Sequence, residues 1–206
     1  YGANIIFTNP KQAFLDAENA KNEGYYFIHP FDGPLTLQGS ATLGLEIVEY
    51  LKLINTKIDN LLISVGGGGL ISGVSSYIKQ FYPKIKIIGV EPENANGLNQ
   101  SLRANKPLNN INVNSIADSL SAPLHMQYSF DVAKEVIDEM VTVSDDEMKK
   151  FMVFCYKKFK LFLEPACVAG LAALKYKINN KLIGKNTMVI LCGSNIDKKT
   201  WSDLTN

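Results

Sequence analysis

Hydrophobic and polar positions along the chain change their period repeatedly, which predicts an alternation of strands and helices. Three short runs, at 61–65, 85–90 and 188–191, are apolar at nearly every position, a pattern typical of strands buried on both faces of a parallel sheet. Segments with the helical spacing of apolar residues lie around them, at 40–53, 70–81, 96–103, 132–140, 144–161 and 165–176. Repeated strand–helix–strand units predict an α/β fold, with a mostly parallel sheet and helices on both faces.

The N-terminal part of the chain shows shorter elements. The apolar runs at 3–7 and 25–28 predict two short strands, with a helix from 9 to about 23 between them. Gly24 stands where a helix commonly ends in the left-handed conformation. Prolines and an Asp-Gly pair in the segment 29–39 predict a loop before the next helix.

Two later helices have recognisable start signals. Ser144 and Glu147 have the Ser-x-x-Glu spacing of a capping box, in which each side chain accepts a hydrogen bond from the other residue's backbone N–H. Pro165 suits the first turn of a helix, because the N–H that it lacks would have no partner there. The short run 141–143 predicts a strand immediately before the first of these helices.

Composition narrows the class of protein. A chain of 206 residues is long enough for one sizeable core, or for one domain and part of a second. Hydrophobic residues make up 46% and charged residues 20%, as in ordinary globular proteins. The net charge is +1 and Arg103 is the only arginine, which argues against a nucleic-acid partner. No apolar run approaches the ~18–20 residues that span a bilayer, so we expect no membrane partner.

Cysteines and histidines give no metal signature. Cys155, Cys167 and Cys192 are an odd number without CxxC spacing, and reduced thiols in a cytoplasmic protein are the simplest interpretation. His29 and His125 lie far apart in the sequence, which argues against a zinc site built from histidine and cysteine.

The segment Ser64–Leu70 contains four consecutive glycines, Gly66, Gly67, Gly68 and Gly69, between a predicted buried strand and a helix. Glycines let the backbone bend freely and approach a ligand closely, and the N–H groups at the start of the helix favour an anion. We therefore expect a phosphate to bind here. A dinucleotide-binding turn is the main alternative, since Glu91 ends the next strand where a ribose-binding acid would stand, although the glycine spacing and the lack of a Walker lysine fit this poorly.

Several stretches taken in order resemble one family. They are GPLTLQGSATLGLEI at 33–47, SVGGGGLISG at 64–73, GVEP at 89–92, IAD at 116–118, LEP at 163–165 and LCGSN at 191–195. Together they resemble the pyridoxal-phosphate-dependent serine/threonine dehydratases, with serine racemase as a close relative, over essentially the whole chain. The resemblance implies fold type II of these enzymes. It also implies a lyase of amino-acid metabolism, a threonine/serine ammonia-lyase that removes water and ammonia from its substrate and leaves a 2-oxo acid.

The resemblance also implies roles for individual residues. Gly66 through Gly69, together with Leu70, would hold the cofactor phosphate through their backbone N–H groups. Cys192 falls where the family places a neutral serine or cysteine beside the pyridine nitrogen. Glu164 falls where the family has a glutamate near the cofactor ring, although an acid at a helix start has a purely structural explanation as well. The cofactor implied by this set is pyridoxal 5′-phosphate.

Two departures from the family qualify the resemblance. The Schiff-base lysine, in a Ser-x-Lys-x-Arg-like segment, is missing, and we expect it upstream of Tyr1. By position, residues 1–30 would then be the remnant of a small domain, and 31–206 the large cofactor-binding domain. We thus expect a fragment that is inactive alone. Relatives can bind Mg²⁺ or Ca²⁺ in the loop after the GVEP motif, and the matching ligands here would be Glu91 and the carbonyl of Ala95, while an aspartate ligand is replaced by Gly97.

The sequence leaves several functions open. Serine racemase or hydroxyaspartate dehydratase activity would use the same cofactor. A nicotinamide-dinucleotide enzyme would use the same loop, and a truncated, non-catalytic paralogue would act through interaction with another subunit. Dimerisation is common in the family, so a homodimer is one further expectation.

Overall fold

The computed structural model describes residues 2–205, and the chain divides into two compact units between Pro30 and Phe31. In the first unit, helix α1 (Pro10–Asn22) begins after Asn9, whose side chain accepts a 2.9 Å hydrogen bond from the Gln12 N–H. Gly24 follows the helix with a φ of +92°, as predicted. The predicted strands at 3–7 and 25–28 are wrong, because neither segment pairs with another strand in the described part of the chain and an isolated strand leaves its backbone groups unbonded.

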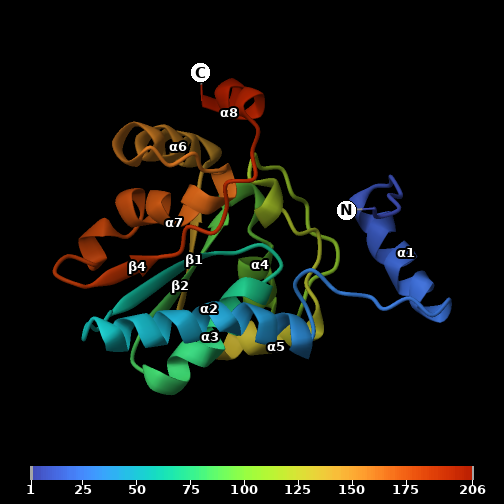
Figure 1. Cartoon of the computed structure of the whole chain (residues 1–206), viewed down its shortest axis with the longest axis horizontal. Coiled ribbons are helices and arrows are strands. Elements are labelled where there is room, and N and C mark those ends of the chain that lie inside the picture. The colour runs from blue at the N-terminus through green and yellow to red at the C-terminus, as the bar shows by residue number, and fades with distance from the viewer. Residues whose placement is uncertain (1, 206) are drawn as a thin grey trace. The chain divides into compact units, whose positions relative to one another are not determined.

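The second unit is built on a four-stranded sheet. Its strands are β1 (Asn60–Ser64), β2 (Lys86–Pro92), β3 (Glu139–Val143) and β4 (Thr187–Val189). They lie in the order β3-β2-β1-β4, and every pair is parallel (Figure 1). The predicted parallel sheet is confirmed, and the segments at 61–65, 85–90 and 188–191 supply three of its strands. Burial on both faces holds for the first two, whereas β4 is only half-buried and Leu191 is exposed, because β4 is an edge strand.

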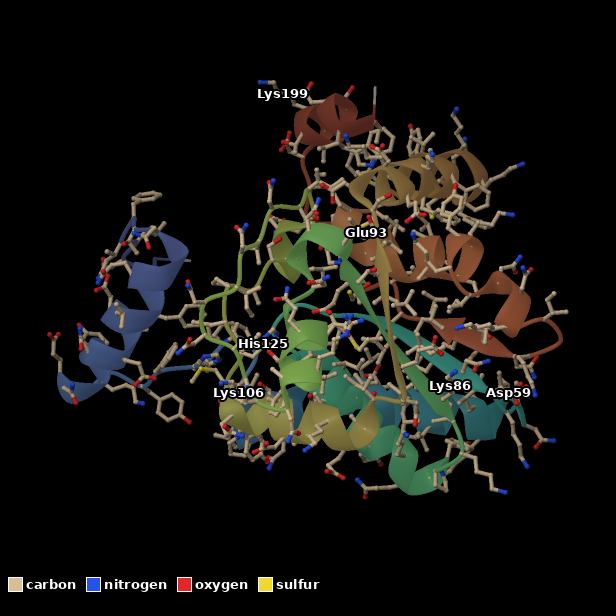
Figure 2. All side chains as sticks on the ribbon, turned by 180° about the vertical axis from the view of Figure 1, so that it is seen from behind. Asp59, Lys86, Glu93, Lys106, His125 and Lys199 are labelled. Carbon is tan, nitrogen blue, oxygen red and sulfur yellow. The ribbon has the colours of Figure 1, made fainter. Side chains whose placement is uncertain are left out.

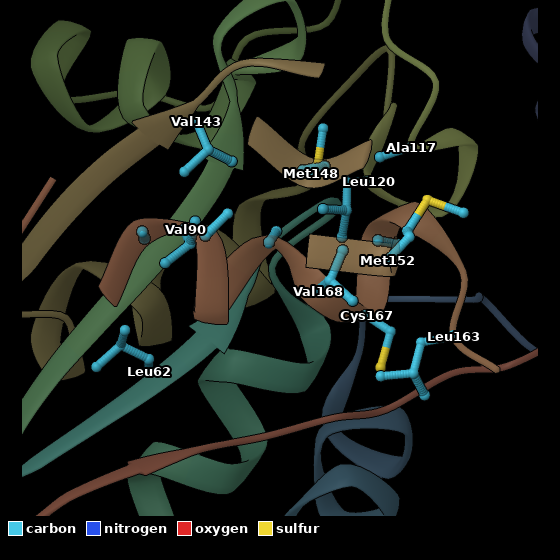
Figure 3. Close-up of a cluster of buried hydrophobic side chains, with 14 of the residues drawn as sticks. Leu62, Val90, Ala117, Leu120, Val143, Met148, Met152, Leu163, Cys167 and Val168 are labelled. Carbon is cyan, nitrogen blue, oxygen red and sulfur yellow. The ribbon is translucent and has the colours of Figure 1, made fainter. Parts of the chain in front are cut away.

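Helices cover both faces of the sheet. Helices α2 (Pro34–Leu53), α3 (Gly69–Phe81) and α5 (Gln127–Val136) pack on one face, and α6 (Asp145–Phe159) and α7 (Pro165–Tyr176) on the other (Figure 1). Successive strand residues alternate between two cores, since Leu61 and Ile63 face the first group of helices while Leu62 faces the second. Figure 3 shows the second core, with Leu62 and Val90 of the sheet close to α7.

Two glycines allow α2 and α3 to pack closely. A Cβ added to Gly44 in α2 would lie 2.7 Å from the carbonyl oxygen of Val74 in α3. A Cβ added to Gly73 in α3 would lie 2.7 Å from the Cβ of Ser40 in α2. The two backbones therefore approach more closely than any other residue would permit, and this contact fixes α3, whose first turn follows the glycine loop.

Some element boundaries differ from the prediction. Helix α2 begins at Pro34, inside the segment predicted as a loop, because proline fits the first turn of a helix and Gly33 precedes it with a φ of +90°. Helix α5 ends at Val136, before the predicted end at 140, because Glu139 and Met140 already pair with β2. Two short helices complete the unit, α4 (Gly97–Ala104) and α8 (Lys198–Thr205).

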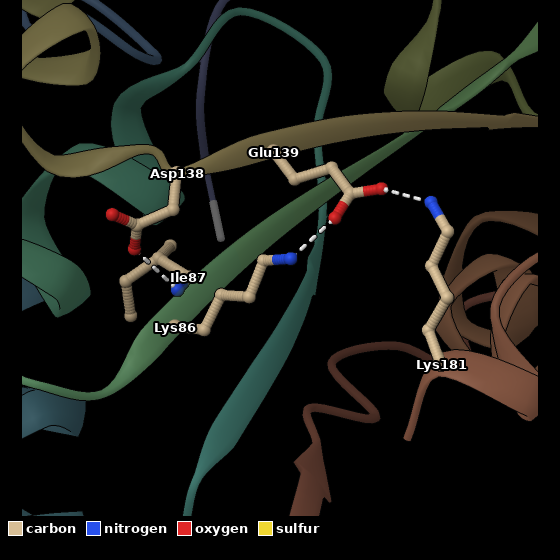
Figure 4. A network of polar contacts seen from close by, with 5 residues as sticks. All are labelled: Lys86, Ile87, Asp138, Glu139 and Lys181. Atoms are coloured by element: carbon tan, nitrogen blue, oxygen red, sulfur yellow. Dashed lines mark hydrogen bonds and ion pairs between the residues drawn. The ribbon is translucent and has the colours of Figure 1, made fainter.

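A polar network closes the N-terminal ends of β2 and β3 (Figure 4). The Glu139 carboxylate accepts hydrogen bonds from Lys86 at 2.6 Å and Lys181 at 3.1 Å. The hydrogen bond from Lys86, supported by Lys181, holds the pKa of Glu139 below its ordinary value. Asp138 accepts a 2.7 Å hydrogen bond from the Ile87 N–H. These groups stabilise the end of the sheet opposite the glycine loop.

No described helix is both long and apolar enough to cross a membrane.

Candidate cofactor site

The site lies where the parallel strands end. Strand β1 ends at Ser64 and passes through Val65 into the glycine loop, and helix α3 begins at Gly69. Strand β4 leads to Cys192 through Ile190, whose N–H donates to the Leu62 carbonyl at 3.1 Å. Carboxyl ends of neighbouring parallel strands meet at one edge of a sheet, which is where ligands bind in such folds.

Each of the four glycines is required for an identifiable reason. Gly68 has a φ of +90°, which other residues rarely adopt. A Cβ at Gly66 would lie 2.8 Å from the Ser119 carbonyl oxygen, and one at Gly69 would lie 2.7 Å from the Phe31 carbonyl oxygen. A Cβ at Gly67 would overlap the Phe31 ring. The conformation of the loop therefore depends on the segments at Phe31 and Ser119 that pack against it, as well as on the flexibility of its glycines.

The start of α3 offers hydrogen-bond donors without acceptors. Gly68 is the N-cap and supplies no side chain to bond them. The first N–H groups of a helix have no carbonyl one turn earlier to donate to, and the helix dipole makes them attractive to an anion. Ser64, at the end of β1, has a buried hydroxyl that lacks a hydrogen-bond partner among the described residues. The N–H groups at the start of α3 suit an anion such as the phosphate of pyridoxal 5′-phosphate.

Cys192 and Glu164 come together at the second strand end. Cys192 is exposed, and the carboxylate of Glu164 accepts a 2.9 Å hydrogen bond from the Asn195 N–H. A Cβ at Gly193 would overlap that carboxylate, so a larger residue there would displace the Glu164 side chain. Desolvation raises the pKa of the Cys192 thiol above its ordinary value, and the charge of Glu164 acts in the same direction. The thiol therefore carries its proton at neutral pH and is available as a neutral donor.

Glu91, the expected cation ligand, is bonded to the protein backbone. Its side chain is buried, and its two oxygens accept hydrogen bonds from the N–H groups of Leu98 at 2.7 Å and Asn99 at 3.0 Å. Desolvation raises the pKa of Glu91 to about 8, although the two hydrogen bonds oppose that shift. Ala95 is buried in the 3₁₀ turn Glu93–Ala95. Over residues 2–205, no group of three or more His, Cys, Asp or Glu side chains is placed to hold a metal ion.

The sequence analysis missed two side chains that brace the loop and α3. The ring of His125 lies with Nε2 at 3.1 Å from the carbonyl oxygen of Gly66 (Figure 2). Asp32 accepts a 2.7 Å hydrogen bond from the N–H of Ser129, and the carbonyl of Ser129 accepts one at 3.0 Å from Ser72 in α3. Neither side chain belongs to a motif with the glycines, so only the fold reveals the contacts.

Comparisons with known proteins agree with this geometry. A family model described as pyridoxal-phosphate dependent enzyme matches residues 1–193. A phenylserine dehydratase of Ralstonia pickettii is 38% identical, over 98% of this chain and 61% of that protein. An L-threonine ammonia-lyase of Geobacter sulfurreducens is 35% identical, over 98% of this chain and 50% of that protein. The solved structure of maize serine racemase superposes with a TM-score of 0.84 at 28% identity, over 98% of this chain and 63% of the other. The chain thus spans half or somewhat more of the length of the curated relatives.

Proposed function

This chain belongs to the pyridoxal-phosphate-dependent enzyme family, and from that premise we propose that its protein is a threonine/serine ammonia-lyase. The reaction eliminates water from L-threonine or L-serine, and hydrolysis of the product releases ammonia and a 2-oxo acid. The relatives named as a threonine ammonia-lyase and a phenylserine dehydratase support this class of reaction. Because the chain spans only part of their length, the activity is proposed for the protein translated from the complete reading frame.

We infer a division of labour between the two strand ends. Pyridoxal phosphate, when bound, supplies an electron sink for the charge that develops at the substrate Cα. The N–H groups of Gly66 through Leu70 bind the phosphate at the start of α3. Cys192 would lie beside the pyridine nitrogen with a neutral thiol, which would leave that nitrogen largely unprotonated. Glu164 holds the loop that carries Cys192 through its hydrogen bond to Asn195. We propose no residue of this chain as the lysine that forms the Schiff base with the cofactor.

The observation that carries the proposal is the uncapped, all-glycine turn between β1 and α3. A second observation argues against the dinucleotide alternative. A ribose-binding acid must have carboxylate oxygens available to accept from hydroxyl groups. Both oxygens of Glu91 already accept from backbone N–H groups of α4, so they are committed within the protein.

The test uses protein expressed from the complete reading frame. We expect an absorbance change on adding pyridoxal 5′-phosphate, followed by ammonia release from L-threonine or L-serine, with L-phenylserine as a third substrate. Gly67→Val should abolish cofactor binding because its side chain would overlap Phe31, whereas Gly39→Ala, in open space on α2, should not. Binding of NAD in place of pyridoxal phosphate would refute the proposal. Formation of D-serine without ammonia would favour serine racemase instead.

We extend the proposal to the location of the enzyme, its oligomeric state and a bound cation. The three cysteines are free, as expected for a cytoplasmic protein, and fractionation tests that location. A homodimer is proposed and would be tested by light scattering. A Mg²⁺ or Ca²⁺ ion at Glu91 and the Ala95 carbonyl would require Glu91 to release its bonds to α4. Calorimetric titration with either ion, on wild type and on Glu91→Gln, tests that site.

A further inference from the structure

We propose that His125 is a positioning residue for the phosphate loop, which holds the Gly66 carbonyl in place and thereby directs the Gly67 N–H toward the phosphate. The inference rests on the proposed function, because it takes the cofactor phosphate as the ligand of the loop. A peptide bond is planar and trans, so the carbonyl of one residue and the N–H of the next point in opposite directions. A hydrogen bond that fixes the Gly66 carbonyl on one side therefore presents the Gly67 N–H on the other.

The contacts of His125 define which ring nitrogen carries the proton. Its Nε2 lies 3.1 Å from the Gly66 carbonyl oxygen, which can only accept, so Nε2–H must donate. Its Nδ1 lies 3.2 Å from the hydroxyl of Ser101 on α4. That hydroxyl already accepts from the Leu108 N–H at 3.2 Å, so its own hydrogen can point to Nδ1. The Leu108 N–H, the Ser101 hydroxyl, the His125 ring and the Gly66 carbonyl thus form one continuous series of hydrogen bonds.

The ring is also held by packing. His125 is only 4% exposed, and its own N–H donates to the Leu108 carbonyl at 2.7 Å. A Cβ at Gly97 would lie 2.8 Å from the Cε1 of the ring, so glycine at the start of α4 makes room for it. Burial lowers the pKa of His125, which keeps the ring neutral and preserves the acceptor at Nδ1. The imidazole thus links α4 to the glycine loop through one hydrogen bond on each side.

Of the two loops that form the site, His125 bonds the glycine loop. The Cys192 loop has a separate anchor, the hydrogen bond from the Asn195 N–H to Glu164. Loss of the imidazole would leave the half-buried Gly66 carbonyl without its donor and free the Gly66–Gly67 peptide to rotate. Affinity for the phosphate should fall, while contacts to the rest of the cofactor should not change.

The experiment separates the phosphate from the ring of the ligand. Pyridoxine 5′-phosphate and pyridoxine differ only in the phosphate, and neither has the aldehyde that forms a covalent bond. Calorimetry on the cofactor-free protein from the complete reading frame should show that His125→Phe weakens pyridoxine 5′-phosphate about tenfold, as loss of one hydrogen bond would. Binding of pyridoxine should be unchanged. His125→Gln, whose amide nitrogen can stand near the position of Nε2, should retain affinity within about threefold of wild type.

Control variants distinguish a loss of phosphate binding from a general loss of stability. Asp138→Asn weakens the hydrogen bond from the Ile87 N–H and the ion pair with Lys79, both at the opposite end of the sheet, so it should lower the melting temperature without changing phosphate affinity. Wild-type affinity of His125→Phe for pyridoxine 5′-phosphate, or equal weakening of both ligands, would overturn the role of His125. Should His125→Phe fail to fold, His125→Gln must bind more tightly than the shorter His125→Asn. Equal binding of both ligands by wild type would instead refute the phosphate site and with it the proposed function.

Discussion

Replacement of Gly73 by alanine tests the packing that places the site. Gly73 lies in α3, one turn after the glycine loop, against the backbone of α2. An added Cβ would overlap the carbonyl oxygen of Leu37 and would lie 2.7 Å from the Cβ of Ser40 and 3.0 Å from the N of Ala41. Two of these three atoms are backbone and cannot rotate away, so the helices must separate. Gly39→Ala is the matched control, because its Cβ would meet no atom within 4 Å on the exposed side of α2.

The expected magnitudes follow from these contacts. Alanine in place of glycine stabilises a helix interior by about 1 kcal/mol, and Gly39→Ala should gain that amount. Gly73→Ala gains the same propensity but overpacks the contact between α2 and α3, which costs about 3 kcal/mol at the upper end of the usual range. The net change in the free energy of unfolding is a loss of about 2 kcal/mol, or a melting temperature lower by about 4–8 °C for a protein of this size.

Urea denaturation and thermal melting of both variants provide the measurement. Calorimetric titration with pyridoxine 5′-phosphate adds a functional reading, because a shift of α3 would move the N–H groups that bind the phosphate. We expect weaker binding by Gly73→Ala and wild-type binding by Gly39→Ala. If Gly73→Ala were as stable as Gly39→Ala, the close approach of the two helices would be wrong, and so would this account of how the loop is positioned.

Two further predictions concern the buried carboxylate of Glu91 and the N-cap of α6. Burial raises the pKa of Glu91 from 4.5 to about 8, so the folded state holds a proton that the unfolded chain releases, and stability should fall as the pH rises from 4.5 to 8. Relative to the non-titrating Glu91→Gln, wild type should lose stability across that window in urea denaturation, and parallel profiles would contradict the shift. Ser144→Ala removes the hydroxyl that accepts from the Glu147 N–H at 3.2 Å, so unfolding should become easier by about 1 kcal/mol, whereas an unchanged urea midpoint would rule out the capping box as a stabilising feature.

Local patterns in the sequence were sufficient for much of the fold. The apolar run at 61–65 predicts a buried strand because a parallel strand is covered on both faces, and β1 is buried at all five positions. The capping box at Ser144 and Glu147 is confirmed, with both of its hydrogen bonds present. These features depend on residues a few positions apart, so they can be recognised without the fold. The strands predicted at 3–7 and 25–28 failed because pairing depends on a partner that the local sequence does not specify.

The sequence by itself determined the parallel α/β fold, the glycine loop and the resemblance to a family of pyridoxal-phosphate enzymes. Only the tertiary structure decided what surrounds the loop. It brings Phe31 and Ser119 against the glycines, and it places His125 against the Gly66 carbonyl, 59 positions away in the chain. It also commits Glu91 to the N–H groups of α4. Such contacts depend on where distant segments meet, and a pattern of neighbouring residues carries no information about that meeting.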